Sequence, residues 1–227
     1  MKKLWVCLAI GIVALSGGTA RAAQSAQSTQ SAQVDDCAAP PALPPMSKPP
    51  VTYGYDIRPQ ALFDLEQMKQ RFVCLAEAIP AEKYNWRPED GVRSIAEVYL
   101  HITSNNYTIP EPLGVAEVPA KYKAKDWEKS TTDKATIVAE LRQSFDYAIA
   151  AINKVPSTEI ATSLPKLGPE ANKGDVEYLL VTHMHEHLGQ SIGYARSVGV
   201  TPPWTVAAEA AAKKKAAEGK PASQQPE

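Results

Sequence analysis

The sequence has 227 residues and a formal net charge of −1, with 24 basic against 25 acidic residues. This length suits one domain with appendages, and the balanced charge makes nucleic acid a poor partner, because nucleic-acid-binding domains carry a basic excess. The chain contains only 12 glycines and few aromatic residues, which argues against a β-rich design.

The first 22 residues are typical of a secretory signal peptide. Two lysines at positions 2–3 precede an apolar run over residues 4–15, and residues 20–22 form an A-x-A cleavage pattern. The apolar run is short for an ordinary membrane-spanning helix, although an uncleaved N-terminal anchor is the alternative. We therefore expect a periplasmic or secreted protein with no stable membrane insertion after signal cleavage.

Residues 23–54 are expected to form a disordered, proline-rich linker. Residues 23–36 are polar and repetitive, and six prolines stiffen residues 37–50. Cleavage would leave Cys37 and Cys74, which an oxidising compartment allows to pair. Two unrelated thiols are an equally good interpretation, because spacing alone does not decide pairing.

Residues 55–206 are predicted to form an all-α four-helix bundle. Apolar residues recur there at steps of three and four, the period of a helix with one buried face. Ser94 and Glu97 form a capping box, Thr132 is the expected N-cap of the third helix, and Gly199 is the expected C-terminal glycine. The four helices are expected at residues 59–78, 94–107, 133–153 and 175–198.

The connections predict more than a simple up-and-down bundle. The segment 111–131 has no helical period and is long for a connection within a compact domain, a feature common in functional loops. A second long connection covers residues 157–173. After the bundle, residues 207–227 read as a low-complexity tail that begins as a frayed helix.

Three of the four histidines lie in the last predicted helix, and they do not share one face. His183 and His187 are four residues apart and lie within about 40° of each other, whereas His185 is about 200° from His183. The pair borders an apolar stripe, where imidazoles need a hydrogen bond or a metal. His101, on the second helix, is the remaining histidine, and bundles build metal sites from facing helices.

These three imidazoles, His101, His183 and His187, therefore predict a site for a divalent metal ion. Zinc fits best, and nickel or iron are alternatives. A weaker interpretation is that these are hydrogen-bonded core histidines.

Two stretches resemble the DinB-like, or YfiT-like, metal-dependent hydrolase superfamily. These are WRPEDGVRSIAEVYLHITSNNY, residues 86–107, and HMHEHLGQSIGYARSVGVTPPW, residues 183–204. The resemblance covers residues 55–204 and implies a four-helix bundle with one metal-binding histidine on the second helix and two on the last. Those positions correspond to His101, His183 and His187.

The resemblance leaves the reaction open. Characterised members of the superfamily include thiol-dependent transferases and isomerases, but export favours a metal-activated water and hence hydrolysis. A non-catalytic bundle that binds a metal or small ligand is the alternative, as is a thiol-dependent transferase. We expect a small-molecule substrate or ligand of unknown identity, no nucleic acid, and a homodimer as an open option; no catalytic residue is assigned.

Spacing on the helices also suggests residues that support the metal ligands. Gln190 and Tyr194 follow His187 on the same side of the helix, and Asn105 lies one turn beyond His101. Glu97 lies one turn before His101 and could accept a hydrogen bond from the imidazole, although its capping role competes. Simple interhelical hydrogen bonding is the alternative for each of Gln190, Tyr194 and Asn105.

Overall fold

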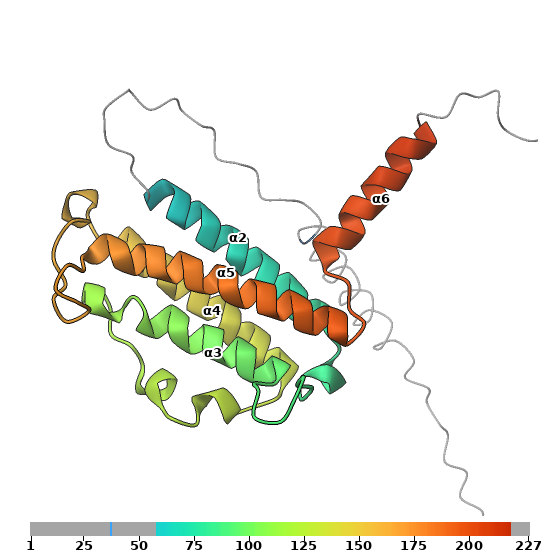
Figure 1. Ribbon diagram of the computed structural model, residues 1–227, viewed down its shortest axis with the longest axis horizontal. Helices are drawn as coiled ribbons and strands as arrows, with labels where there is room; N and C mark the ends of the chain where they lie inside the picture. Colours follow the sequence, from blue (N-terminus) through green and yellow to red (C-terminus); the bar gives the residue numbers. More distant parts are fainter. Residues whose placement is uncertain (1–36, 38–57, 219–227) are drawn as a thin grey trace, which may run out of the picture. The chain divides into compact units, whose positions relative to one another are not determined.

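The computed structural model describes Cys37 and residues 58–218 (Figure 1). The expected signal peptide (1–22), the linker apart from Cys37 and residues 219–227 lie outside the described residues. Within the described part the regular elements are all helical, which confirms the all-α class. The α-helices are α2 (Arg58–Ala78), α3 (Ile95–Thr108), α4 (Lys134–Asn153), α5 (Lys173–Ser197) and α6 (Pro203–Glu218).

Local sequence signals set the helix ends. The capping box of Ser94 is present, since its side chain accepts from the Glu97 backbone N–H while Glu97 accepts from that of Ser94. The expected N-cap at Thr132 is wrong: Asp133 caps α4 by accepting from the Thr136 backbone N–H at 2.7 Å. The reason is position, because Asp133 directly precedes the first helical residue and its carboxylate reaches an otherwise unpaired N–H.

The start and end of α5 follow the same logic. This helix begins two residues earlier than expected, because Asn172 and Asp175 form a reciprocal capping box around its first turn. After its end, Gly199 has a φ of 83°, a left-handed conformation that glycine adopts without steric cost.

The four helices α2 to α5 pack as a bundle in which neighbours in sequence are not all antiparallel. Figure 1 shows α2 and α5 running in one direction and α3 and α4 in the other. The side-chain contacts agree, since Arg58 at the start of α2 bonds Glu177 near the start of α5 and the carbonyl of Val155 just after α4. Because α3 and α4 are parallel, the chain between them must return along the bundle.

This return is made by residues 109–133, which we call the α3–α4 connection. It contains three 3-10 turns, η2 (Glu111–Leu113), η3 (Ala120–Lys123) and η4 (Trp127–Lys129). Tyr122 stacks on Tyr107 of α3 with ring centroids 3.8 Å apart, and the Trp127 indole N–H donates to the Leu100 carbonyl at 2.9 Å. The expected long loop is thus tied to α3 at two points.

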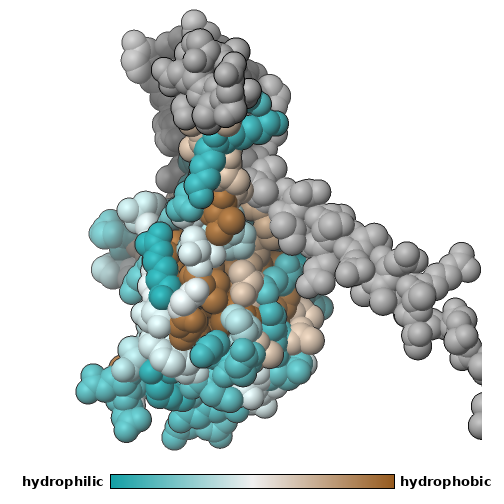
Figure 2. All heavy atoms as spheres, turned by 90° about the vertical axis from the view of Figure 1, so that its right-hand side faces the viewer, coloured by the Kyte–Doolittle hydropathy of each residue, from teal (hydrophilic) through white to brown (hydrophobic). Residues whose placement is uncertain are grey.

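Beyond the bundle, α6 follows Gly199 and Pro202 and begins at Pro203. Residues 207–218 of the expected tail form most of this helix, in keeping with the high helix propensity of its alanines. None of its residues is buried, and Trp204 meets Arg71 of α2 with the guanidinium carbon 5.4 Å from the ring centroid. Figure 2 faces the end of the bundle where α2 and α5 finish, with hydrophobic residues visible between hydrophilic ones.

A disulfide joins Cys37 to Cys74 of α2. The question that the sequence left open is therefore answered in favour of pairing. The bond fastens a residue of the expected linker to a helix of the core. None of the described helices has the length and apolar composition needed to cross a membrane.

Candidate metal centre

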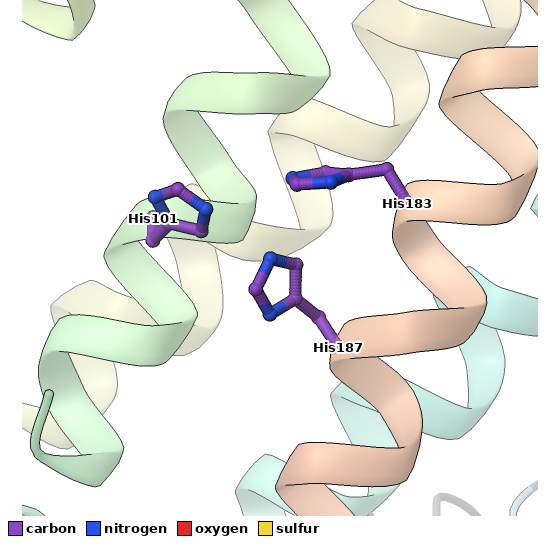
Figure 3. A group of neighbouring side chains, drawn as sticks. All are labelled: His101, His183 and His187. Atoms are coloured by element: carbon purple, nitrogen blue, oxygen red, sulfur yellow. The ribbon is translucent and has the colours of Figure 1, made fainter. Parts of the chain in front are cut away.

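The three histidines singled out from the sequence meet between α3 and α5. Figure 3 shows His101 projecting from α3 toward His183 and His187, which lie one turn apart on α5. One ligand atom from each ring lies within 4.8 Å of the others. His185 is exposed, which confirms that helical geometry separates it from the pair.

Apolar residues around the cluster shield it from solvent. His187 is 7% exposed, and its neighbours Met184 and Leu188 are 0% and 5% exposed. Burial lowers the pKa of His101, and it lowers the pKa of His183 to about 4, with the neighbouring His187 and His101 adding to the effect. His101 and His183 are thus neutral at neutral pH, the form in which imidazole binds metals.

Hydrogen bonds show which nitrogen of His101 carries the proton. Its Nδ1 lies 2.7 Å from Oε1 of Glu128, and a carboxylate can only accept, so Nδ1–H donates. The side-chain amide of Asn105 then donates to Nε2 of His101 at 2.8 Å and to Nε2 of His183 at 3.0 Å. Both Nε2 atoms therefore carry lone pairs, and one amide group satisfies the two.

His187 is held by a second chain of hydrogen bonds along α5. Its Nδ1 lies 2.8 Å from Oε1 of Gln190, and the Gln190 amide donates to the Tyr194 hydroxyl at 3.3 Å. The Tyr194 ring meets Trp86 edge to face, with centroids 5.4 Å apart. The three supporting residues suggested by spacing are therefore all connected to the cluster. Asn105 and Gln190 bond its histidines directly, and Tyr194 bonds Gln190.

Two residues beside the cluster were missed by the sequence reasoning. Glu128 bonds His101, and Arg93 grips both oxygens of Glu128 at 2.6 and 3.0 Å. Burial raises the pKa of Glu128, but the hydrogen bonds from Arg93 and His101 outweigh it and hold the pKa below its usual value. The available signal was Trp127, an aromatic residue in a polar stretch, which marks where the connection returns to the core.

The alternative that Glu97 accepts a hydrogen bond from His101 does not occur. The Glu97 carboxylate is used by the Ser94 backbone N–H at 2.7 Å and by Arg87 at 3.1 Å. Its capping role prevails because the first turn of α3 holds its side chain toward the helix end. Glu186, which directly precedes His187 on α5, is exposed.

The donor set fits a divalent ion. Two nitrogens bound to one zinc ion are at most about 4.2 Å apart, given Zn–N bonds of about 2.1 Å. The 4.8 Å limit on the present spacing means that a small closure of the side chains would bring the three donors within range. Imidazoles on two helices, with the Nδ1 atoms of His101 and His187 each oriented by a further hydrogen bond, match the usual design of such sites.

Comparisons with known proteins agree with this architecture. Residues 64–191 match the family model of the DinB superfamily. The crystal structure of a DinB-like protein from Bacillus cereus ATCC 10987 is similar with a TM-score of 0.53 and 17% identity, over 63% of this chain and 93% of that one. At this identity the likeness concerns the fold alone. No curated protein matches the chain.

Proposed function

Because the chain belongs to the DinB superfamily, we propose that it is an exported metal-dependent hydrolase. His101, His183 and His187 hold one divalent ion in this proposal. The observation that carries it is the convergence of three imidazoles from two helices within 4.8 Å. Zinc is the preferred ion, with nickel or iron as alternatives, because neutral imidazole suits all three.

The protein's own residues prepare such a site in two ways. The Nδ1–H of His101 donates to Glu128, and that of His187 donates to Gln190. These bonds leave the Nε2 lone pairs of both rings for a ligand. Asn105 satisfies two Nε2 atoms through its amide, and an ion would replace these bonds. When bound, the ion supplies Lewis acidity that lowers the pKa of water or polarises a substrate group.

Export is supported by two independent features. The first 22 residues have the charged, apolar and small-residue segments of a signal peptide. The Cys37–Cys74 bond belongs in an oxidising compartment, since cytosolic thiols are kept reduced. Together they favour the periplasm or the exterior, where a small-molecule substrate and water are at hand and intracellular thiols are not.

A second function, metal or small-ligand binding without catalysis, is favoured by the state of Glu128. In the described part of the chain, this is the carboxylate that bonds the cluster, and Arg93 and His101 already occupy it. It is therefore poorly placed to take a proton from water as a general base. Hydrolysis would then rely on the ion alone.

Elemental analysis of protein purified after expression of the full chain tests the proposal. We expect about one zinc, nickel or iron per chain in the wild type, and loss of the metal in His101→Ala and His187→Ala, because two imidazoles bind far more weakly than three. His185→Ala is the matched control and should keep the ion, since this histidine is exposed. Metal-free wild-type protein that gains no stability on adding zinc or nickel would contradict the site.

A screen of the metal-loaded protein separates the two functions. Simple esters, amides and thiol adducts are offered to the wild type and to His187→Ala. Turnover that disappears in the variant supports a hydrolase or, with a thiol adduct, a transferase. A loaded protein that turns over none of them supports the binding role.

A further inference from the structure

We propose that Glu128 is the positioning residue of the histidine cluster. It locks the tautomer and direction of His101, so that the α3–α4 connection controls the affinity of the site for metal. The part of this inference that concerns metal affinity rests on the proposed function. The part that concerns the tautomer rests on the hydrogen bonds of His101 alone.

The tautomer of His101 follows from its hydrogen bond to Glu128. A neutral imidazole has one proton, and its donation from Nδ1 to Glu128 at 2.7 Å leaves Nε2 of His101 without one. Asn105 supplies independent support at the other side of the ring, because its amide N–H donates to Nε2 at 2.8 Å. A proton on Nε2 would face this donor and lose the bond to Glu128. Both contacts therefore select the same tautomer.

Arg93 fixes the orientation of the Glu128 carboxylate. Arg93 donates from Nε to one oxygen of Glu128 at 2.6 Å and from a terminal nitrogen to the other at 3.0 Å. This two-pronged geometry fixes the plane of the carboxylate as well as its distance. Arg93, which precedes α3, therefore orients the carboxylate of Glu128 toward His101. Glu128 itself belongs to η4, the turn that precedes α4.

Trp127 anchors this turn to α3. Trp127, the residue before Glu128, is 9% exposed, and its indole N–H donates to the carbonyl of Leu100, the residue before His101. Two adjacent pairs thus join η4 to α3. The indole sets the position of the turn, and the carboxylate next to it uses that position to reach the imidazole. The hydrogen bond of Trp127 to Leu100 therefore keeps Glu128 within reach of His101.

The consequence for a metal is specific. A carboxylate bonded to the remote nitrogen of a histidine ligand fixes the ring and raises its basicity, and loss of such a partner costs about 10- to 100-fold in metal affinity. His187 has the neutral amide of Gln190 in the same role, so His101 is the ligand with the stronger support. We therefore expect the site to be most sensitive, apart from its ligands, to the residue at position 128.

Metal affinity of Glu128 variants is the first test. Zinc is titrated against a chelator of known affinity in the wild type, Glu128→Gln and Glu128→Ala. We expect a loss of about tenfold for glutamine, which still accepts a hydrogen bond, and about 100-fold for alanine. Glu111→Ala is the matched control, because Glu111 lies in the same connection but pairs with Lys123. A wild type that binds zinc and Glu128 variants that bind it equally well would overturn the proposal.

The second test needs no metal. Nitrogen-15 NMR of the histidine rings in the protein without metal should show His101 protonated at Nδ1 in the wild type and in Asn105→Ala, where Glu128 alone holds the tautomer. Adding Glu128→Ala to Asn105→Ala should release the ring toward the Nε2–H form. A wild-type His101 protonated at Nε2, or an Asn105→Ala tautomer that the added Glu128→Ala leaves unchanged, would refute the positioning role. This result also decides the matter if the wild type binds no zinc, an outcome that would refute the proposed function instead. If Glu128→Ala fails to fold, Glu128→Leu, which fills a similar space but accepts no hydrogen bond, replaces it in the same comparison.

Discussion

Two polar sites join α5 to the rest of the bundle, and they are built in opposite ways. Near the start of α5, the fully buried Glu177 meets Arg58 of α2 at 2.5 Å, and the guanidinium also donates to the Val155 carbonyl. Near the middle of α5, His183 and His187 face His101, with one ligand atom of each ring within 4.8 Å of the others. The first site pairs opposite charges, and the second gathers three imidazole rings.

The difference shows what each site can do. An ion pair with its hydrogen bonds made has no demand for a ligand, and removing one partner leaves a charge without compensation. The Nε2 atoms of His101 and His183 carry lone pairs that accept from the amide of Asn105, a group that an ion can displace. We therefore assign the first site to stability and the second to binding, and the following changes should separate them.

The largest expected effect is that of Glu177→Ala. It removes the carboxylate that Arg58 meets inside the protein, which should lower the free energy of unfolding by about 3–5 kcal/mol. Urea unfolding measures the loss, and the metal content of the protein that remains folded should not change. Replacing both partners together, Arg58→Met with Glu177→Leu, should recover most of the stability. A small loss in the single variant would break the assignment of this site to stability.

Reduction of the Cys37–Cys74 bond should come next. The two residues are 37 positions apart, and opening a loop of this size costs about 2–4 kcal/mol, in models where the bond restricts the unfolded chain. Thermal unfolding with and without a reductant measures the effect, and Cys37→Ser should behave like the reduced wild type. The histidine cluster should bind metal equally in both states. An equal midpoint with and without reductant would argue against the bond.

Asn105→Ala should alter the second site in the opposite direction from loss of a ligand. The substitution removes the hydrogen bonds from Asn105 to Nε2 of His101 and His183, which an ion must otherwise displace. Each such bond contributes about 0.5–1.5 kcal/mol. We expect metal to bind as tightly as in the wild type or up to about tenfold more tightly, measured by competition with a chelator. A loss as large as that of His101→Ala would show that Asn105 helps to hold the ion.

The smallest effect is a pH dependence of the metal-free protein. Burial, with help from His187 and His101, lowers the pKa of His183 from 6.5 to about 4 in the folded state. The unfolded chain therefore binds more protons between these values, and stability falls as the pH drops through this window. Urea unfolding at several pH values should show a weaker dependence in His183→Gln, and the exposed His185→Gln should match the wild type. Equal pH dependence in all three proteins would contradict the lowered pKa.

Local patterns in the sequence were enough to predict most of the bundle. The helical period and the capping residues located α2 to α5 within two residues at each end, because these signals act over one or two turns. They also paired His183 with His187 and excluded His185, since a helix fixes the angle between residues. Local patterns did not distinguish Thr132 from Asp133 as a cap, because both are good N-cap residues and only the backbone shows which one directly precedes the helix.

What the sequence by itself determined is therefore the helical class, the register of each helix and the three candidate ligands. Only the tertiary structure decided that Glu128 completes the cluster, that Asn105 bridges His101 and His183, and that Cys37 bonds Cys74. Glu128 lies 27 positions from His101 on a connection without period, so its place depends on the path by which the chain returns along the bundle. That path is set by contacts between residues distant in sequence, such as Trp127 with Leu100, which no local pattern encodes.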